Sequence, residues 1–517
     1  MTGSGSFLPV CFQGGNLSDG LAHARGIDCS HAGKRLVDAM AFFPIVQHWF
    51  AWAFFLSEWA IRLAMLTVVP FRRSPAAAQG WLLLIFFEPW IGLVLYGFVG
   101  RPTMSRWRVQ QMAKLPQAMA KIRERVLNHL TMQHLVRPED WTGYLAQKLG
   151  RMPSLGGNDA EILVDYNATL ARLVAEIDHA RNHVHLLYFL FAVDTVTGPV
   201  IAALGRAVKR GVACRVLVDS VGSRSALPVL LPQLTALGVD IRQMLPISFF
   251  GHKRTRLDLR NHRKIAIVDG RVAFTGSQNL VAADFVAGIT YEELVLRLTG
   301  PAVLELQYIF AADWFLETNE VLASEDVFPH PDITGAIAIQ ALPSGPDFPT
   351  QNNHRFLVAL IHAAHTQIHI TTPYFIPDEP MLQALETAAL RGVDVHLVLS
   401  ETGDKVLVTY AQRSYYEELL EARVRVHLYQ RNFLHAKFLT FDDAIGLVGT
   451  SNMDIRSFML NAEHIMVLRD PAITARLKSE QQRYITNCRS LELAQWRQRP
   501  FRTQLAEQLA PLFSPLL

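Results

Sequence analysis

One pattern of residues occurs twice in the chain, and this duplication constrains the fold more than any other feature of the sequence. Both copies read H-x-K-x4-D-x6-G-[ST]-x-N. The residues are His262, Lys264, Asp269, Ser277 and Asn279 in the first copy, and His435, Lys437, Asp442, Thr450 and Asn452 in the second. A single H-x-K is common by chance, but the whole pattern at matching places of a duplication indicates two copies of one functional unit.

The segments around the two copies repeat as well. HVHLLYFLFAVDTVTG, a helical stretch and ACRVLVD correspond to QIHITTPYFIPDEP, a helical stretch and DVHLVLS. Strand, helix and strand in this order predict βαβ units on a mainly parallel sheet. The sequence therefore predicts an α/β fold of two halves, residues 156–325 and 326–517, packed as a pseudo-two-fold pair. At one helix end, Gly238 of the first half corresponds to Arg423, which would cost about 1 kcal/mol in a left-handed conformation.

Each motif is predicted to form a β-hairpin. His262 and Lys264 are two residues apart, so on a strand they project from the same face. Asp269-Gly270 favours a two-residue turn. Such a turn places His262 opposite Ser277, or opposite Asn279 if the loop moves by one residue.

The second hairpin gives the same result, with His435 opposite Thr450 or Asn452. Asp269 and Asp442 lie seven residues after the histidines, an odd number, and are predicted to point away from this face. Both aspartates are therefore interpreted as supporting residues.

Two such patches facing each other would surround one anion with two histidines and two lysines. This composition suits a phosphodiester, whose oxygens gain negative charge in the transition state. One histidine could attack phosphorus while the other protonates the leaving alcohol. The four cysteines are scattered and no carboxylate cluster is visible, so neither a metal nor another cofactor is predicted.

The N-terminal hundred residues indicate a membrane anchor. Half of the chain is hydrophobic and only 18% is charged, which is apolar for a soluble enzyme. After a polar tail at 1–36, predicted to be disordered, the region 37–100 contains apolar runs at 41–69 and 75–99, each long enough to cross a bilayer. They predict a helical hairpin; two buried core helices are the alternative. Tryptophans near the run ends suit membrane interfaces: Trp49, Trp59, Trp81 and Trp90.

The orientation depends on two basic clusters. Arg72 and Arg73 favour a cytoplasmic loop between the runs, but the basic linker predicted at 101–155 carries more positive charge and places the catalytic body in the cytoplasm.

Inside the runs, Glu58, Arg62 and Glu88 could form a buried cluster, with interfacial snorkelling as the alternative. The net charge of only +3 argues neither for nor against a nucleic acid substrate, whereas the membrane hairpin and the lack of an extended basic groove argue against one.

The twin motifs resemble those of the phospholipase D superfamily. The surrounding stretches SEWAIRLAMLTVVPFRRSPAAAQGWLLLIFF, RNHRKIAIVDGRVAFTGSQN, LRLTGPAV, SGPDFP, TTPYFIPD, GTSNMDIRSFMLNAEH and LFSPLL narrow the resemblance to bacterial cardiolipin synthases. The resemblance implies a multi-pass enzyme of the bacterial inner membrane that acts on phosphatidylglycerol among anionic lipids. It implies transfer of a phosphatidyl group between two phosphatidylglycerols through a phosphohistidine. Another phospholipase D-type phosphatidyltransferase or a phospholipid hydrolase is the alternative.

The resemblance also assigns roles to residues. The motif histidines, lysines and aspartates would be catalytic, with His262 the nucleophile and His435 the acid and base, although the symmetry of the sequence does not decide between them. Glu293 and Glu463 match the carboxylates that orient the histidines. Ala462 replaces a usual phenylalanine, which leaves the preferred substrate in doubt. A catalytically dead scaffold would have lost motif residues, and none is missing.

Overall fold

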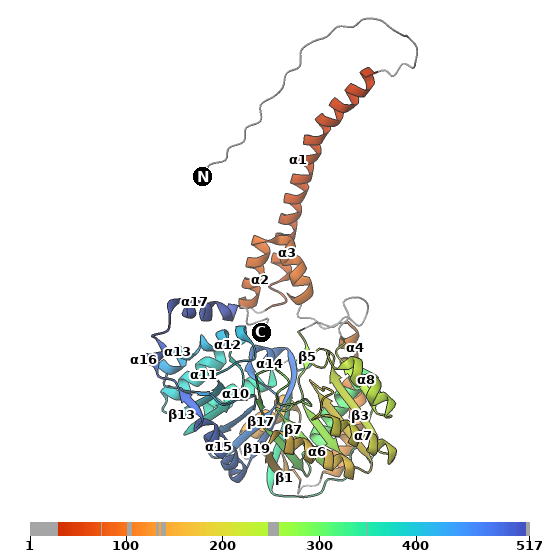
Figure 1. The fold of residues 1–517 in the computed structure, drawn as a ribbon, viewed down its shortest axis with the longest axis vertical. Helices are drawn as coiled ribbons and strands as arrows, with labels where there is room; N and C mark the ends of the chain where they lie inside the picture. Colours follow the sequence, from red (N-terminus) through yellow and green to blue (C-terminus); the bar gives the residue numbers. More distant parts are fainter. Residues whose placement is uncertain are drawn as a thin grey trace, which may run out of the picture. The chain divides into compact units, whose positions relative to one another are not determined.

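The structure is a computed structural model and describes residues 29–73, 75–100, 106–130, 134–135, 141–246, 258–348 and 350–512. The chain forms two compact units, residues 1–102 and 103–517 (Figure 1). The predicted disordered tail lies outside the described residues up to 28; from Cys29 onward the chain is helical.

The N-terminal unit consists of α1 (Cys29–Val68), α2 (Pro75–Phe87), α3 (Pro89–Leu95) and the π-helical segment η1 (Tyr96–Gly100). Within the described residues, only His48–Val68 is long and apolar enough to cross a membrane. The second apolar run, which we predict to cross as one helix, is divided at Glu88 and Pro89 into α2 and α3. Proline lacks an N–H and disfavours the helical conformation of the residue before it, and Glu88 accordingly has φ −130° and ψ 79°.

The predicted charge cluster in this unit forms in part. Arg62 Nη1 donates to Glu58 at 3.2 Å, and Arg62 Nε donates to the main-chain oxygen of Phe86 at 3.1 Å. Arg62 therefore contacts the main chain next to the helix break rather than the carboxylate of Glu88.

The segment predicted as a linker contributes two helices to the second unit. In α4 (Arg106–His129), Met119 and Ile122 are buried in a core that also contains α9 (Val303–Thr318). Arg108 of α4 forms an ion pair with Glu317 at 2.6 Å. In α5 (Trp141–Gly150), Ala146 belongs to the core of the second half.

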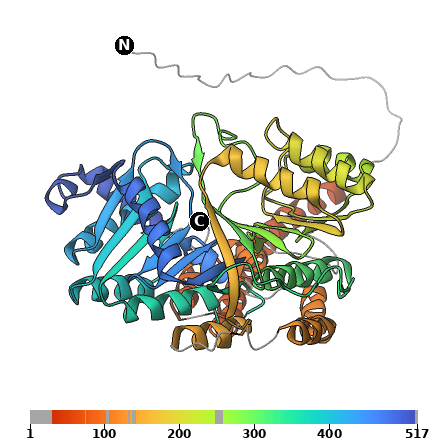
Figure 2. The ribbon, with the colours of Figure 1, turned by 90° about the horizontal axis from the view of Figure 1, so that it is seen from below.

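The catalytic unit is built on one sheet shared by both halves (Figure 2). The strands of the first half are β1 (Leu155–Leu163), β2 (His183–Tyr188), β3 (Ala213–Asp219), β4 (Asp240–Met244), β6 (Ile265–Val268), β7 (Val272–Gly276) and β9 (Val295–Thr299). Those of the second half are β10 (Ile337–Ser344), β11 (Gln367–Thr371), β13 (Asp394–Ser400), β14 (Arg425–Tyr429), β16 (Phe438–Phe441), β17 (Ile445–Gly449), β19 (Asn461–Arg469) and β20 (Cys488–Ser490).

The order of strands is β20-β14-β13-β11-β16-β17-β19-β10-β1-β9-β7-β6-β2-β3-β4. Antiparallel pairing of β1 with β10, Leu155 opposite Ile339, joins the two halves. The predicted α/β duplication is therefore present, but the sheet is mixed rather than mainly parallel. Along this order β2–β3–β4 and β11–β13–β14 are parallel and the other neighbouring strands are antiparallel, in part because the motif hairpins add antiparallel strands.

The remaining helices of this unit pack on the sheet or on one another. In the first half they are α6 (Tyr166–His179), α7 (Gly198–Lys209) and α8 (Leu227–Ala236) besides α9. In the second they are α10 (Asn352–Ala363), α11 (Glu379–Leu390), α12 (Val406–Arg413), α13 (Tyr416–Glu421), α14 (Ile455–Met459), α15 (Pro471–Ile485), α16 (Leu493–Trp496) and α17 (Phe501–Leu509). The short β12 (Phe375–Ile376) pairs with β18 (Met453–Asp454).

The motif hairpins form, but the predicted registers were wrong by one residue. Val268 pairs with Val272, and Phe441 pairs with Ile445, so three residues separate the strands in each hairpin. Asp269 and Gly270 both have positive φ, as the predicted turn requires, and Arg271 is the additional residue. A bulge of one residue at the turn shifts the whole register.

The helix end at Arg423 tests the cost of a left-handed arginine. Its φ is 70°, and Gly238 has φ 82° in the same hydrogen-bond pattern. We expect Arg423→Gly to raise the free energy of unfolding by up to about 1 kcal/mol. Urea denaturation of the solubilised protein measures this. The neighbour Ala422 has φ −74°, so Ala422→Gly should lower stability; a loss in both variants would contradict the explanation.

Candidate active site

A short parallel ladder between the halves positions the first motif histidine. Strand β5 (Arg260–Asn261) pairs with the start of β19, with Arg260 opposite Asn461. The main-chain N–H of His262 continues the ladder by donating to the oxygen of Ala462 at 2.8 Å. His262 of the first half is thereby held next to Glu463 of the second.

The second histidine is positioned in the same way with the halves exchanged. Strand β15 (Phe433–Leu434) pairs with β8 (Tyr291–Glu292), and the N–H of His435 donates to the oxygen of Glu292 at 2.8 Å. His435 of the second half therefore lies next to Glu293 of the first.

Each histidine binds the carboxylate of the opposite half. His262 Nδ1 donates to Glu463 Oε1 at 2.9 Å, and His435 Nδ1 donates to Glu293 Oε1 at 2.7 Å. Because a carboxylate only accepts, the proton of each neutral ring is held at Nδ1, and the Nε2 lone pair is left for chemistry. The motif spacing predicted neither the exchange nor its direction.

Burial dominates the titration of these pairs. It lowers the pKa of His262 to about 4 and also lowers the pKa of His435, against the attraction of the glutamates. Burial raises the pKa of Glu463, but His262 and Lys264 hold it below its ordinary value. At neutral pH the site thus contains neutral imidazoles on ionised carboxylates.

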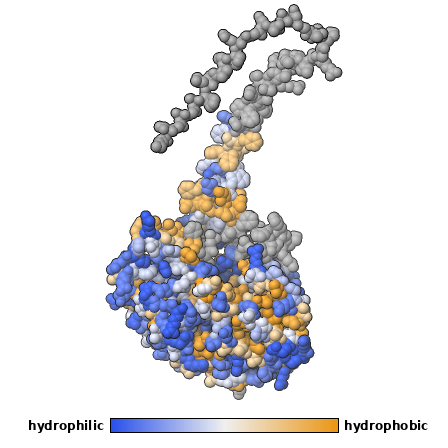
Figure 3. Space-filling view, in the orientation of Figure 1, coloured by the Kyte–Doolittle hydropathy of each residue, from blue (hydrophilic) through white to orange (hydrophobic). Residues whose placement is uncertain are grey.

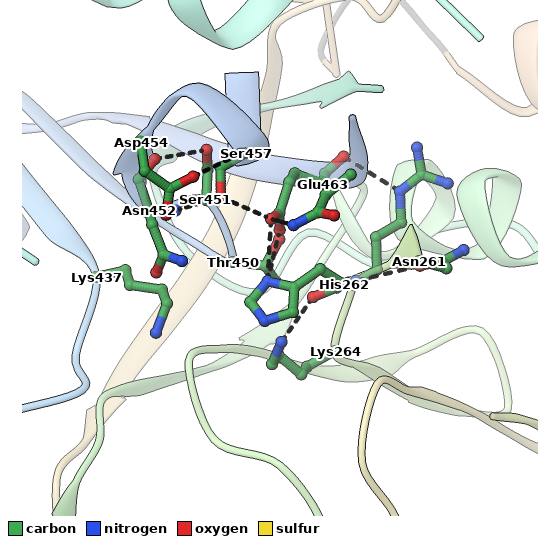
Figure 4. Close-up of polar contacts among 12 residues, drawn as sticks. Asn261, His262, Lys264, Lys437, Thr450, Ser451, Asn452, Asp454, Ser457 and Glu463 are labelled. Atoms are coloured by element: carbon green, nitrogen blue, oxygen red, sulfur yellow. Dashed lines mark hydrogen bonds and ion pairs between the residues drawn. The ribbon is translucent and has the colours of Figure 1, made fainter. Parts of the chain in front are cut away.

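The two motif lysines are buried beside the histidines. Lys264 Nζ donates to the main-chain oxygen of His262 at 2.7 Å, and Lys437 Nζ to that of His435 at 2.6 Å. Burial lowers the pKa of Lys264 to about 7 and of Lys437 to about 8. Each lysine also lowers the pKa of the opposite histidine, so both motifs face one site, where Lys437 approaches His262 and Lys264 (Figure 4).

The surroundings of the two histidines differ. The ring of Tyr291 lies 5.4 Å from that of His435, and the ring of Tyr374 lies 6.5 Å away. Both hydroxyls donate to Asp404, at 3.2 Å from Tyr291 and 2.7 Å from Tyr374. On the other side, Phe189 contacts His262 edge to face at 4.9 Å. Polar groups therefore line the side of His435.

A second asymmetry lies between the motif residues. Arg263 is buried, donates to both carboxylate oxygens of Asp313 at 2.8 and 2.7 Å, and donates to the main-chain oxygen of Glu463 at 3.1 Å. Its counterpart in the second half is Ala436. Arg263 thus binds α9 of its own half through an ion pair and β19 of the other half through a main-chain hydrogen bond, whereas Ala436 has no polar side chain for either contact.

The arrangement suits displacement at an anionic ester. Two imidazoles present Nε2 toward a region flanked by two ammonium groups, so one can attack while the other transfers a proton. The ammonium groups stabilise the negative charge that develops on the reacting group.

Comparisons with known proteins show the family to which the chain belongs. Residues 173–314 and 357–485 match the family profile described as cardiolipin synthase, PLD-like domain. The chain is 32% identical to cardiolipin synthase A of Pectobacterium atrosepticum over 484 residues, which cover 90% of this chain and 98% of that protein. The chain belongs to the phospholipase D-like cardiolipin synthase family.

Other family members and a solved structure extend the comparison. Cardiolipin synthase A of Proteus mirabilis is 31% identical over 480 residues, covering 90% of this chain and 98% of that protein. The crystal structure of phosphatidylserine synthase from Haemophilus influenzae has a TM-score of 0.56 at 14% identity, covering 73% of this chain and all of that one. The latter shows a shared fold.

In this site of a cardiolipin synthase family member, the hydroxyls of Ser277 and Thr450 form hydrogen bonds with main-chain groups next to the glutamates. Ser277 Oγ accepts from the N–H of Leu294 at 2.9 Å, and Thr450 Oγ1 accepts from the N–H of His464 at 3.1 Å. Each hydroxyl therefore helps to place the carboxylate one residue earlier, Glu293 or Glu463, and supports the site in this way.

The motif asparagines lie near the lysines. Asn279 and Lys264 line the same small pocket, and Asn279 Oδ1 accepts from the N–H of Leu190 at 3.3 Å. Asn452 lies beside Lys437 (Figure 4), and its main-chain N–H donates to Ser457 at 3.2 Å.

The motif aspartates lie at the hairpin turns and bind main-chain groups. Asp269 accepts from the N–H groups of residues 181, 182 and 183 at 2.8, 2.7 and 2.9 Å. Asp442 accepts from residues 365–367, at 2.8 Å from Thr366. They hold the starts of β2 and β11, which differs from the catalytic role that the resemblance implied.

Sequence reasoning missed several residues of the site. Tyr374 stands in TTPYFIPD and Tyr291 before Glu293, yet neither has an equivalent aromatic residue in the duplication that would have indicated a role. Ser457 donates to Glu463 at 3.1 Å, and Asn461 does so at 3.4 Å. Among the described residues, no group of three or more His, Cys, Asp or Glu side chains is placed to hold a metal ion.

The exchanged pairs predict that both glutamates are needed at once. Glu463→Gln and Glu293→Gln lose the charge that holds each ring, so we expect each to lower kcat by about 10²-fold or more. Glu292→Gln is the matched control, because Glu292 binds Tyr429 and Asn432 instead of a histidine. Turnover measurements on all three variants test this; equal losses would mean that the charge at this strand, rather than the pairing, matters.

The lysine pKa values predict how anion binding depends on pH. An ammonium attracts an anion only while protonated, so affinity for sulfate should fall as pH rises through about 7 and about 8. The Lys264→Arg variant should stay charged over this range, so its affinity for sulfate should fall less as the pH rises through about 7. Calorimetric titration between about pH 6 and 9 measures it. A flat profile for the parent protein would contradict buried, titrating lysines.

Proposed function

We propose that this protein is a cardiolipin synthase that transfers the phosphatidyl group of one phosphatidylglycerol to a second, giving cardiolipin and glycerol. The observation that carries the proposal is the pair of histidines, each on the glutamate of the opposite half, with both motif lysines at one site. Family membership supports the same reaction.

In the first step, Nε2 of neutral His262 attacks phosphorus. The N–P bond forms, the bond to the glycerol oxygen breaks, and His435 gives its proton to that oxygen. The anionic substrate favours protonation of His435, and Glu293 stabilises the resulting cation. The two lysines stabilise the charge on the phosphoryl oxygens.

In the second step, the phosphatidyl group leaves His262. A free hydroxyl of the second phosphatidylglycerol gives its proton to His435 and attacks phosphorus, and the N–P bond breaks. Glu463 holds the Nδ1 proton of His262 throughout, so the ring leaves as neutral imidazole.

The surroundings support this division of roles. Tyr291, Tyr374 and Asp404 lie next to His435 and offer hydrogen-bonding groups to a polyol. His262 instead lies against the apolar ring of Phe189, and among the described residues no tyrosine ring contacts it. We therefore propose His435 as the acid and base toward glycerol, and His262 as the nucleophile.

The location that fits this function is the bacterial inner membrane, with the catalytic unit on the cytoplasmic side. The apolar segment His48–Val68 supports anchoring, and the basic residues after Gly100 support the orientation. The substrates and partners would be phosphatidylglycerol and other anionic lipids, without a nucleic acid and without a cofactor.

A lipid assay tests the proposal. The purified, solubilised protein receives phosphatidylglycerol labelled in its headgroup, and we expect cardiolipin and free glycerol. His262→Ala and His435→Ala should each lose activity by about 10³-fold or more. His179→Ala, on an exposed helix end, is the control.

The products discriminate among the reactions. Phosphatidic acid as the main product would make the protein a hydrolase. Radiolabelled phosphorus retained on the alkali-quenched parent chain, and absent from His262→Ala, would support the phosphohistidine. Full activity of either alanine variant would overturn the mechanism.

A further inference from the structure

The second apolar run of the N-terminal unit folds back on itself. Gly92 of α3 packs against Ile85 of α2 so closely that a Cβ on Gly92 would lie 2.7 Å from Ile85 Cγ1. Nearer the ends, the rings of Trp81 and Tyr96 meet edge to face at 5.3 Å. These contacts pair residues of α2 with residues after Pro89 in antiparallel order.

The two ends of this run are tied together. Arg73 Nε, in the loop before α2, donates to the main-chain oxygen of Gly100 at 2.9 Å. The chain therefore enters α2 and leaves η1 at the same level. A single crossing helix would instead separate residues 73 and 100 by the thickness of the bilayer.

The depth of the turn follows from lengths and contacts. Helix α2 has 13 residues and is about 20 Å long, short of the ~30 Å hydrocarbon layer, whereas the 21 residues of His48–Val68 span about 31 Å. The turn meets α1 at Arg62, six residues before Val68. That contact lies about 9 Å from the end of α1, so the turn reaches only part of the way along the span.

The remainder of the span is uncovered. Large apolar side chains before Arg62 are exposed: Trp49, Phe50, Trp52, Phe54, Phe55 and Leu56. Figure 1 shows α1 extending beyond α2 and α3, and Figure 3 shows apolar side chains on this unit. A turn in hydrocarbon leaves main-chain polar groups without hydrogen-bond partners, which costs free energy. Arg62, which is paired with Glu58, reduces this cost by donating a hydrogen bond to the carbonyl of Phe86.

The charges favour the same topology. If both runs crossed, Arg72 and Arg73 would face the side opposite to the basic residues that follow Gly100. With the second run folded back, both basic clusters lie on one side, which the positive-inside rule favours.

We propose that α2, α3 and η1 form a re-entrant hairpin inserted into the lipid from the side of the catalytic unit, and that α1 is the spanning helix. The residues before α1 and the catalytic unit then lie on opposite faces of the membrane. This inference rests on the membrane location proposed above.

Cysteine labelling of the full chain in bacterial membranes tests the topology. One variant keeps only Cys11, with Cys29, Cys214 and Cys488 replaced by serine. The other also carries Cys11→Ser and has Gln498→Cys, an exposed position of the catalytic unit. With a membrane-impermeant maleimide on spheroplasts, we expect Cys11 to react at once and the Gln498→Cys variant only after lysis. Labelling of both from the same side would overturn the inference.

Two controls separate this result from other failures. Release of the protein by alkaline carbonate would refute the membrane location itself, and cardiolipin formation by each variant shows that it is folded. Glu88→Leu with Pro89→Leu removes the break, so the run should cross and bring both labels to one side. Labels that stay on opposite sides in this variant would show that the break does not turn the chain, against the inference.

Discussion

The exchange of glutamates between the halves is the interaction on which the rest of the site depends. Neither half contains a complete catalytic pair, because His262 binds Glu463 and His435 binds Glu293. Two-residue ladders, β5 with β19 and β15 with β8, set these distances through main-chain hydrogen bonds. The continuous sheet across β1 and β10 makes the ladders possible. The active site is thus a product of the duplication, and one half alone would leave each histidine without its orienting carboxylate.

The two halves have the same backbone arrangement, but the side chains around His262 and His435 differ. The backbone, the lysines and the hydroxyls repeat in both halves. Arg263, however, corresponds to Ala436 in the second motif, and the tyrosines bound to Asp404 lie beside His435. A reaction with a nucleophile and an acid needs this inequality, because two identical histidines would compete for both roles. The backbone supplies the geometry, and the neighbouring side chains distinguish the roles.

The motif residues divide between chemistry and support. Histidines and lysines face the site, whereas Ser277 and Thr450 hold the strands of the glutamates and Asp269 and Asp442 hold the starts of two strands. Residues that recur at one spacing therefore need not share one role. The carboxylates of Asp269 and Asp442 each accept several main-chain N–H groups, and they stabilise the local fold through these hydrogen bonds.

The duplication, the α/β halves, the motif hairpins and the identity of the histidines and lysines could all be predicted from the sequence, because they depend on local periodicity and on residue type. The sequence also located the left-handed Arg423. The hairpin register, the exchange of Glu293 with Glu463 and the participation of Asp404 were decided by tertiary structure. A single additional turn residue shifts a register, and nothing local records which half supplies a partner. Likewise the apolar run after Pro75 is long enough to cross, and tertiary contacts, such as that of Gly92 with Ile85 and the hydrogen bond from Arg73 to Gly100, show that it turns back.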